Sequence, residues 1–159
     1  MRLVAIDPGT RNTGLVWMSE SRVLDAATIG FAESCGQDNV ALLRRCRAIT
    51  ARLAAWMAER PHDVTVLEGF TSFGGRHQGA CVFQTPFLVG YLLGALPSER
   101  FAIQTSADVL NPSRRGNCAW VKRRTAAGDE VMPGALQCTN DHERSALAHG
   151  MWRLGMGEP

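Results

Sequence analysis

Two carboxylates stand where buried strands are predicted to end. RLVAID, residues 2–7, carries four consecutive apolar residues and stops at Asp7 before a Pro-Gly turn, and VTVLE, residues 64–68, stops at Glu68. Short apolar runs bounded by turn signals are typical of strands buried on both faces. A carboxylate at such a sheet edge is costly to bury alone. A divalent cation such as Mg²⁺ offsets this cost, because one ion binds oxygens from several carboxylates at once. In the structural alternative, Asp7 caps its turn and Glu68 ends a strand in solvent.

The segment NDHERSALAHG, residues 140–150, predicts a final helix with further candidate ligands. Asn140 precedes its first turn, and Glu143 stands where it completes a capping box. At about 100° per residue, one polar stripe consists of His142, Ser145 and His149, with Asp141 at its margin. The opposite stripe, which is predicted to face the core, consists of Ala146, Leu147, Gly150 and Leu154. We expect the polar stripe to be available to a site, although acids in a first turn also suit the helix dipole.

The remaining sequence predicts the elements that position these residues. Three antiparallel strands are expected at residues 2–7, 15–18 and 22–31, then a helix at 38–59 capped by Asp38, and a strand at 64–68. A second helix is predicted to begin with Thr85 as its cap and Pro86 at its first helical position. It is followed by a strand at 101–104, a basic helix-loop segment at 106–128 and the final helix. This order predicts an α/β fold, a mixed sheet with helices on both faces.

The second helix is apolar almost all round and is therefore expected to be buried. Its sequence after the proline is FLVGYLLGAL, residues 87–96. Gly90 and Gly94, four residues apart, would allow another element to pack closely on one side. We favour tight packing against the sheet over a seam between two subunits.

Composition limits the class of protein. The chain has 159 residues, 45% of them apolar, which suits one domain over residues 1–155 with a short tail at 156–159. The longest apolar run is too short to cross a bilayer, and the N-terminal residues show no secretory signal. Five cysteines without a CxxC pair disfavour a disulfide framework and a structural zinc site, so we expect reduced thiols. The net charge of +2 matters less than the clustering of the basic residues.

Three segments taken together resemble motifs of the RuvC-type Holliday junction resolvases. They are AIDPGTRNTG at residues 5–14, VLEGF at 66–70 and DHERSALAHG at 141–150. The resemblance implies an RNase H-like fold with a five-stranded sheet, a homodimer, and Mg²⁺- or Mn²⁺-dependent paired nicking of four-way DNA junctions. It also implies a role in DNA recombination and repair, and a cytoplasmic location in a prokaryotic cell or a phage-infected host.

The resemblance assigns catalytic and metal-binding roles to individual residues. Asp7 and Glu68 match two carboxylate ligands of a site for two ions about 3.5–4 Å apart. His142 matches the first ligand of the last helix and either binds an ion or helps to activate water. The second position of that helix is Asp in the family and Ser145 here, so its role is in question. Asp141 could compensate if the helix is rotated; otherwise the chain is an active-site variant, natural or engineered, or a junction-binding protein with weakened cleavage.

Basic and aromatic residues predict the DNA contacts. The candidates are Phe70, Phe73, Arg76, His77, Arg114, Arg115, Lys122, Arg123 and Arg124. The basic side chains can neutralise phosphates, and the aromatic rings can stack on unpaired bases. Phe73 serves equally well as a loop anchor, and Trp120 as a core residue. An actin-like ATPase lobe with DPGTRNTG as its phosphate loop is a further alternative, but such enzymes need two lobes and the chain has the length of one.

Overall fold

The computed structural model describes residues 1–33, 38–69, 83–96, 101–111 and 118–156. The strands are β1 (Arg2–Asp7), β2 (Asn12–Ser19), β3 (Val23–Gly30), β4 (Val64–Gly69) and β5 (Phe101–Thr105). The helices are α1 (Asn39–Ala58), α2 (Gln84–Ala95), α3 (Ser106–Val109), α4 (Ala119–Ala126) and α5 (Asp141–Arg153), with a short 3-10 helix η2 (Ala135–Gln137).

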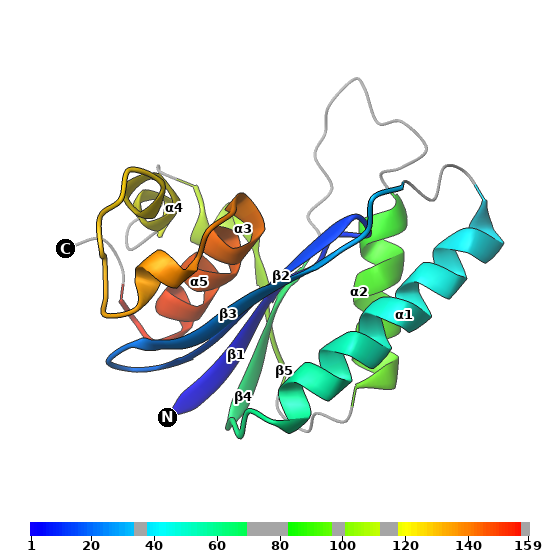
Figure 1. Ribbon diagram of the computed structural model, residues 1–159, viewed down its shortest axis with the longest axis horizontal. Helices are drawn as coiled ribbons and strands as arrows, with labels where there is room; N and C mark the ends of the chain where they lie inside the picture. The colour runs from blue at the N-terminus through cyan, green and yellow to red at the C-terminus, as the bar shows by residue number, and fades with distance from the viewer. Residues whose placement is uncertain (34–37, 70–82, 97–100, 112–117, 157–159) are drawn as a thin grey trace.

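The strands form one mixed sheet in the order β3-β2-β1-β4-β5. The pairs β1–β2 and β2–β3 are antiparallel, whereas β1–β4 and β4–β5 are parallel. Helices α1 and α2 cover one face, and α3, α4 and α5 cover the other (Figure 1). The predicted α/β class, with a mixed five-stranded sheet and helices on both faces, is confirmed.

Alternation along the strands divides the core into two layers. On β1, Leu3 and Ala5 pack with α4 and α5, while Val4 and Ile6 pack with α1 and α2. Because successive side chains of a strand point to opposite faces, Asp7 belongs to the α5 side. On β4, Val66 packs on the α5 side, so Glu68 belongs there too. Both carboxylates are therefore presented to the final helix.

Two glycines allow α5 to lie very close to the sheet. A Cβ atom on Gly14 of β2 would overlap the backbone of His142 and Glu143 at the start of α5. A Cβ atom on Gly150 would overlap the sulfur of Met18 on β2, and Leu3 lies next to it. These two contacts set the distance between α5 and the sheet along most of the helix.

Helix boundaries agree with the sequence in two cases and differ in one. The side chains of Asp38 and Asn140 cap α1 and α5, as predicted: Asp38 accepts from Val40 N at 2.8 Å, and Asn140 accepts from the amides of residues 142 and 143 at 3.1 Å. The predicted cap of α2 is wrong, because α2 begins at Gln84 and Thr85 lies inside it. Phe83, which precedes the helix, has no side chain that could cap it, and the buried Gln84 side chain accepts a hydrogen bond from Thr10 at 3.1 Å.

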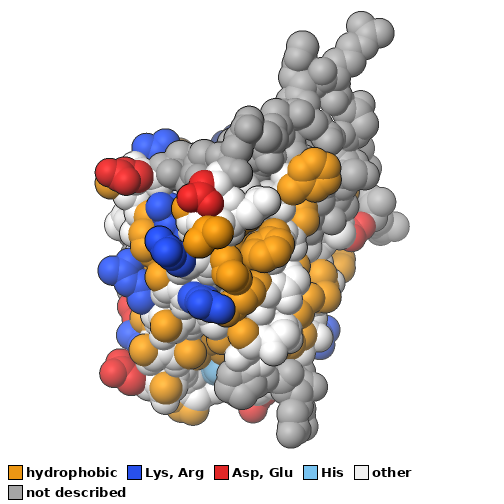
Figure 2. Space-filling model, turned by 90° about the vertical axis from the view of Figure 1, so that its right-hand side faces the viewer, with side chains coloured by type: hydrophobic (Ala, Val, Ile, Leu, Met, Phe, Trp, Pro, Cys, Tyr) orange, Lys and Arg blue, Asp and Glu red, His pale blue; other side chains and the backbone are white. Residues whose placement is uncertain are grey.

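The glycines of α2 were predicted to pack against the sheet, and this prediction is wrong because both lie on the outer face of the helix. A Cβ atom on Gly90 or Gly94 would meet nothing within 4 Å, so neither glycine is packed against the sheet. The helix buries Leu88, Val89 and Leu92 instead. Its exposed stripe consists of Phe83, Phe87, Gly90 and Gly94, with Phe83 74% and Phe87 46% exposed. Apolar side chains gather on this side of the molecule beside several Lys and Arg side chains (Figure 2).

Two predictions from composition can be compared with the described residues. Cys46, Cys118 and Cys138 are buried, and burial raises the pKa of the Cys118 thiol to about 11 and that of the Cys138 thiol to about 12. No helix within the described residues is both long enough and apolar enough to span a membrane.

Candidate metal and catalytic site

Asp7 and Glu68 meet at the carboxyl ends of two neighbouring parallel strands. The register pairs Ile6 with Leu67, which places the next residue of each strand side by side at the sheet edge. Each of the two carboxylate side chains is 16% exposed. The two acids predicted from the sequence to share a site are thus brought together by β-sheet register.

His142 joins the pair from the first turn of α5. Its Nδ1 lies 3.0 Å from Asp7 Oδ2, and its side chain is 40% exposed. The position of the ring follows from two features of the chain: Asn140 fixes where the helix begins, and Gly14 allows the helix backbone to lie on β2. His142 is therefore the predicted helix residue that directly contacts Asp7.

The rest of the polar stripe of α5 is buried against the sheet. Ser145 is 3% exposed and donates to Glu68 Oε2 over 3.4 Å. His149 is fully buried, and its Nε2 lies 3.3 Å from Glu68 Oε2. The other ring nitrogen of His149 lies 3.2 Å from the side-chain oxygen of Gln104 on β5. The prediction that the opposite stripe faces the core is incomplete, since the polar stripe is buried as well.

The two carboxylates are held in different protonation environments. Burial raises the pKa of Asp7, and the charge of Glu68 raises it further, although the hydrogen bond from His142 opposes both effects. Burial also acts to raise the pKa of Glu68, but the close approach of His149, Asp7 and Ser145 outweighs it, so that pKa is lowered. The hydrogen bond to Asp7 raises the pKa of His142. Two neighbouring, partly buried carboxylates favour binding of a proton or a cation.

A buried hydrogen-bond network around Glu143 anchors the start of α5, in place of the predicted capping box. Glu143 is 5% exposed and accepts hydrogen bonds from Thr28 Oγ1 at 2.7 Å and from the backbone amide of Thr139 at 2.7 Å. Asn140 donates to Thr28 Oγ1 at 2.7 Å. The predicted capping box would instead return Glu143 to the amide of Asn140. The network ties the first turn of α5 to the edge strand β3 and thereby steadies His142.

The remaining predicted residues lie away from this group or outside the described part of the chain. Asp141 is 76% exposed and forms an ion pair with Lys122 of α4, with Nζ and Oδ2 3.0 Å apart. Its side chain is therefore not among those that surround Asp7 and Glu68. Arg123 is exposed, and Arg124 pairs with Asp129 at 2.8 Å. Trp120 is 8% exposed and belongs to the core. The other DNA-contact candidates, Phe70, Phe73, Arg76, His77, Arg114 and Arg115, lie outside the described residues.

Gln104 is the site residue that the sequence analysis did not single out. Its neighbour two residues earlier, Ala102, packs on the α5 side, and strand alternation therefore turns Gln104 to the same side as Glu68. The signal was a polar residue inside a short apolar strand, at a position directly across from Glu68 in the register. Reading that signal required knowledge that β4 and β5 are neighbours.

The arrangement of acids and imidazoles suits divalent ions held through few protein ligands. Within the described residues, no three His, Cys, Asp or Glu side chains are grouped so as to share one ion. The side chains instead form two carboxylate–imidazole pairs, Asp7 with His142 and Glu68 with His149. Mg²⁺ commonly binds through one or two carboxylates and completes its shell with water and substrate phosphate. By this chemistry Asp7 and Glu68 fit such an ion, and Ser145 adds no charge.

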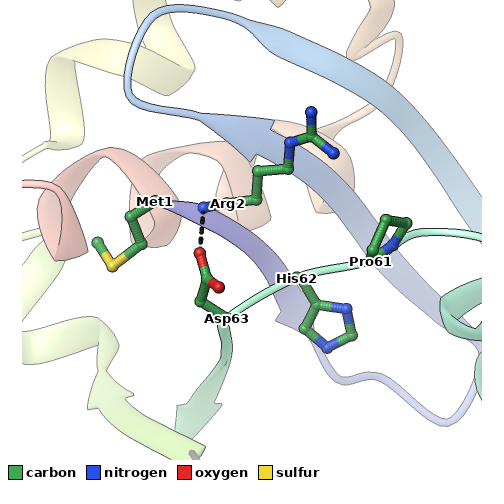
Figure 3. A pocket seen from close by; sticks show the side chains of 5 residues that line it. All are labelled: Met1, Arg2, Pro61, His62 and Asp63. Atoms are coloured by element: carbon green, nitrogen blue, oxygen red, sulfur yellow. Dashed lines mark hydrogen bonds between the residues drawn. The ribbon is translucent and has the colours of Figure 1, made fainter.

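A surface depression lies at the opposite end of the sheet and has a different character. It has a volume of about 420 Å³ and is lined by Met1, Arg2, Pro61, His62 and Asp63 (Figure 3). Asp63 accepts from the backbone amide of Arg2 at 2.8 Å. Both ring nitrogens of His62 are engaged, one with the carbonyl of Arg60 and the other with the hydroxyl of Thr65. The polar groups here serve local structure, so the site is assigned to the other end.

Comparisons with known proteins identify the fold. No protein-family model matches the chain, and no curated protein matches its sequence significantly. RuvC of Thermus thermophilus is similar in structure, with a TM-score of 0.65, 18% identity, and coverage of 100% of this chain and 99% of that one. The same protein in complex with a Holliday junction substrate has a TM-score of 0.64 and 17% identity, with coverage of 100% of this chain and 99% of that one. The resolvase of Fowlpox virus, in complex with substrate Holliday junction DNA, has a TM-score of 0.52 and 11% identity, with coverage of 98% of this chain and 95% of that one. The chain therefore has the RNase H-like fold of RuvC-type resolvases, as its three motifs predicted.

Proposed function

We propose that this chain is a metal-dependent endonuclease that resolves four-way DNA junctions by paired nicking. The observation that carries the proposal is the convergence of Asp7, Glu68 and His142 at one sheet edge. Support comes from the fold, which is shared with a RuvC and a viral resolvase whose solved structures contain Holliday junction DNA. Such an enzyme would act where the DNA is, in the cytoplasm of a prokaryotic cell or a phage-infected host.

Each of the three side chains has a distinct task in this chemistry. Asp7 and Glu68 would hold Mg²⁺ or Mn²⁺, and two ions would have one carboxylate each. When bound, the metal supplies positive charge that activates water and stabilises the leaving 3′ oxygen. His142 has Nδ1 engaged with Asp7, so Nε2 is the nitrogen that remains to exchange a proton with water. Asp7 orients that ring and favours its protonated form.

Ser145 favours a second candidate function, a junction-binding protein with weakened cleavage. A neutral hydroxyl supplies no charge to an ion, and in the structure it already donates to Glu68. Asp141 does not replace the missing carboxylate, because its side chain is exposed and paired with Lys122. Such a protein would keep the fold and the basic residues of α4, and it would lose most of the cutting rate.

A cleavage assay distinguishes the two candidates. The substrate is a synthetic four-way junction with one labelled strand in each preparation, and the control is a linear duplex of the same sequence. The nuclease proposal expects symmetric nicks in opposed strands with Mn²⁺ or Mg²⁺ and none in EDTA. Tight shifted complexes without product would favour the binding protein, and cutting of the linear duplex at the same rate would contradict junction selectivity.

Helix α4 provides a DNA contact that can be tested in the described part of the chain. Lys122 and Arg123 each changed to Ala are expected to weaken junction binding and to lower the slope of log affinity against log salt by about one unit per lost phosphate contact. The effect of Arg123 should be the larger, because Lys122 is already paired with Asp141. Affinity is measured by fluorescence anisotropy at several salt concentrations.

The control for this measurement is Arg22→Ala, an exposed arginine in the turn between β2 and β3. It should leave both affinity and slope unchanged. If the slope of log affinity against log salt is the same in Arg123→Ala and the wild type, the DNA does not contact α4 at Arg123.

A homodimer is the assembly that paired nicking requires, and the exposed stripe of α2 is the surface we assign to it. The stripe joins two exposed phenylalanines to glycines that leave room for a close neighbour. Phe87→Glu is expected to convert a dimer into single chains of 17.3 kDa, because it would place a charge in an apolar contact. Light scattering coupled to size-exclusion chromatography measures the mass.

The matched control is Leu136→Glu, since Leu136 is 49% exposed but lies in η2, away from α2. Its mass should equal that of the unchanged protein. A wild-type mass of one chain, or a dimer that persists with Phe87→Glu, would contradict this interface.

A further inference from the structure

His149 is a buried imidazole whose Nε2 faces the carboxylate of Glu68. The residue is fully buried between α5 and the sheet. Its Nε2 faces Glu68 Oε2 at 3.3 Å, and within the described residues this nitrogen makes no well-formed hydrogen bond. A buried polar atom that is left without a hydrogen bond commonly indicates an ion or water that the site can take up.

The surroundings of His149 are those of a metal-binding imidazole. Its Nδ1 lies 3.2 Å from Gln104 Oε1, so a proton on Nδ1 would be donated to that oxygen and Nε2 would keep its lone pair. Metal-binding histidines usually donate their other ring N–H to an oxygen acceptor in this way. Gln104 is itself 4% exposed, and its position is set by the pairing of β5 with β4.

The distance between His149 and Glu68 also suits two ligands of one ion. Metal bonds to nitrogen and oxygen are about 2.1 Å long, so two ligand atoms of one ion lie between about 3.0 and about 3.4 Å apart for right-angled to tetrahedral geometry. The observed 3.3 Å falls inside this interval. Ser145 Oγ lies 3.4 Å from the same carboxylate oxygen, on the same face of the helix.

We propose that His149 is a metal ligand, and that its Nε2 and the Glu68 carboxylate together hold one divalent ion. The imidazole would replace the acidic ligand that Ser145 does not supply. The Glu68–His149 pair would then give one ion of the site one oxygen and one nitrogen ligand from the protein, while His142 keeps its role in proton exchange. The inference rests on the proposed function only for the presence of a divalent metal at this site.

The chemical class of the ion follows from the nitrogen ligand. Imidazole suits transition-metal ions, whereas Mg²⁺ prefers an all-oxygen shell. The Glu68–His149 pair should therefore bind Mn²⁺ or Co²⁺ more tightly than Mg²⁺. The preference should be reduced when His149 is removed and an acid is placed at position 145.

The experiment measures metal binding directly. Calorimetric titration with Mn²⁺ is performed on the wild type and on His149→Gln and His149→Leu, and pulsed electron paramagnetic resonance of bound Mn²⁺ detects directly coordinated nitrogen. We expect Mn²⁺ affinity to fall by about 10-fold or more in both variants. Because His142 is a second imidazole near the site, the spectrum is also recorded for His142→Asn, where the nitrogen signal should be that of His149. That signal should vanish in the double variant His142→Asn/His149→Gln.

The control is His62→Gln, which removes a histidine from the opposite end of the sheet (Figure 3). Both ring nitrogens of His62 already have partners. The substitution should leave Mn²⁺ affinity and the nitrogen signal unchanged. Circular dichroism melting confirms that each variant is folded, and His149→Gln keeps a polar side chain beside Glu68 if His149→Leu does not fold.

An unchanged Mn²⁺ affinity and nitrogen signal in folded His149→Gln would overturn the inference. In that case the side-chain amide of Gln104 has the opposite orientation and its N–H donates to Nδ1 of His149. The Nε2–H of His149 then donates to Glu68. The outcome is independent of cleavage: a wild type that binds Mn²⁺ through His149 but never cuts a junction refutes the proposed function and leaves this site intact. A wild type that cuts junctions while His149→Gln keeps unchanged Mn²⁺ affinity and nitrogen signal refutes this site alone.

Discussion

Asp7→Asn and Glu68→Gln are each expected to reduce metal-dependent cutting of a four-way junction by at least about 1000-fold, or ~4 kcal/mol of transition-state stabilisation. Each change removes one negative charge and leaves a side chain of nearly the same shape. The amide cannot hold a divalent ion with comparable strength, because its oxygen is neutral. Single-turnover cleavage with saturating protein measures the chemical step without interference from product release.

The same variants should leave folding and junction binding largely intact. The two acids lie together in a partly buried environment, where burial and the charge of Glu68 raise the pKa of Asp7. Asp7→Asn removes that repulsion, so its thermal midpoint in EDTA should equal or exceed that of the wild type. Loss of cutting with retained stability separates a chemical role from a structural one.

Glu20→Gln is the matched control, because Glu20 is exposed and its partner is the N-terminal amine. It should cut at the wild-type rate. Normal cutting by Asp7→Asn or by Glu68→Gln would show that the corresponding carboxylate does not hold the metal. Unfolding of either variant would instead assign that carboxylate a structural task.

Ser145→Asp is expected to have the second large effect. Without metal it should destabilise the fold, and with metal it should increase the cutting rate. The new carboxylate would replace a hydroxyl that is 3% exposed and 3.4 Å from Glu68 Oε2. In EDTA, a second negative charge at this distance should destabilise the fold by roughly 1–3 kcal/mol, since the two charges would be desolvated together. In Mg²⁺ the added oxygen ligand should increase the cutting rate by about 10-fold or more, because it supplies the charge that the hydroxyl lacks.

The measurement pairs a thermal melt with a cleavage rate, each in EDTA, Mg²⁺ and Mn²⁺. The melting temperature should fall in EDTA and recover on addition of metal. Ser145→Asn has nearly the same shape as Ser145→Asp without the charge, so it should show neither the metal-dependent recovery nor the gain in rate. A Ser145→Asp protein that melts identically with and without metal would mean that position 145 does not reach the ion.

Strand alternation explains why much of the site could be predicted. Asp7 and Glu68 each follow a short apolar run, and their places at the ends of β1 and β4 follow from those runs alone. The cap at Asn140 then fixed the phase of α5, which put His142 on the correct stripe. The fold class followed from the order of strands and helices in the same way.

Other parts of the site depend on contacts between elements that are distant in sequence. The partner of Asp141 is Lys122, on a helix whose position relative to α5 is set by core packing around Trp120 and not by a local pattern. Gln104 became part of the site because β5 pairs with β4 in a particular register. Periodicity identifies which residues share a face of one element, but it does not say which faces of two elements meet.

Helix α2 illustrates the same limit on the opposite side of the sheet. Its sequence is apolar on every face, so periodicity could not say which residues are buried. The structure buries Leu88, Val89 and Leu92 and leaves Gly90 and Gly94 outside. A uniformly apolar helix therefore predicts contact on more than one side without naming the side that faces the sheet.

The close approach of α5 at Gly14 has a consequence for how this site can diverge among related sequences. With the helix backbone resting on β2, α5 can neither slide along the sheet nor rotate on it without a steric clash. Positions 142, 145 and 149 therefore stay opposite the two strand carboxylates whatever residues occupy them. An acid lost at one turn of the helix can be offset by an imidazole one turn later, so metal preference can change through two substitutions while the backbone is conserved.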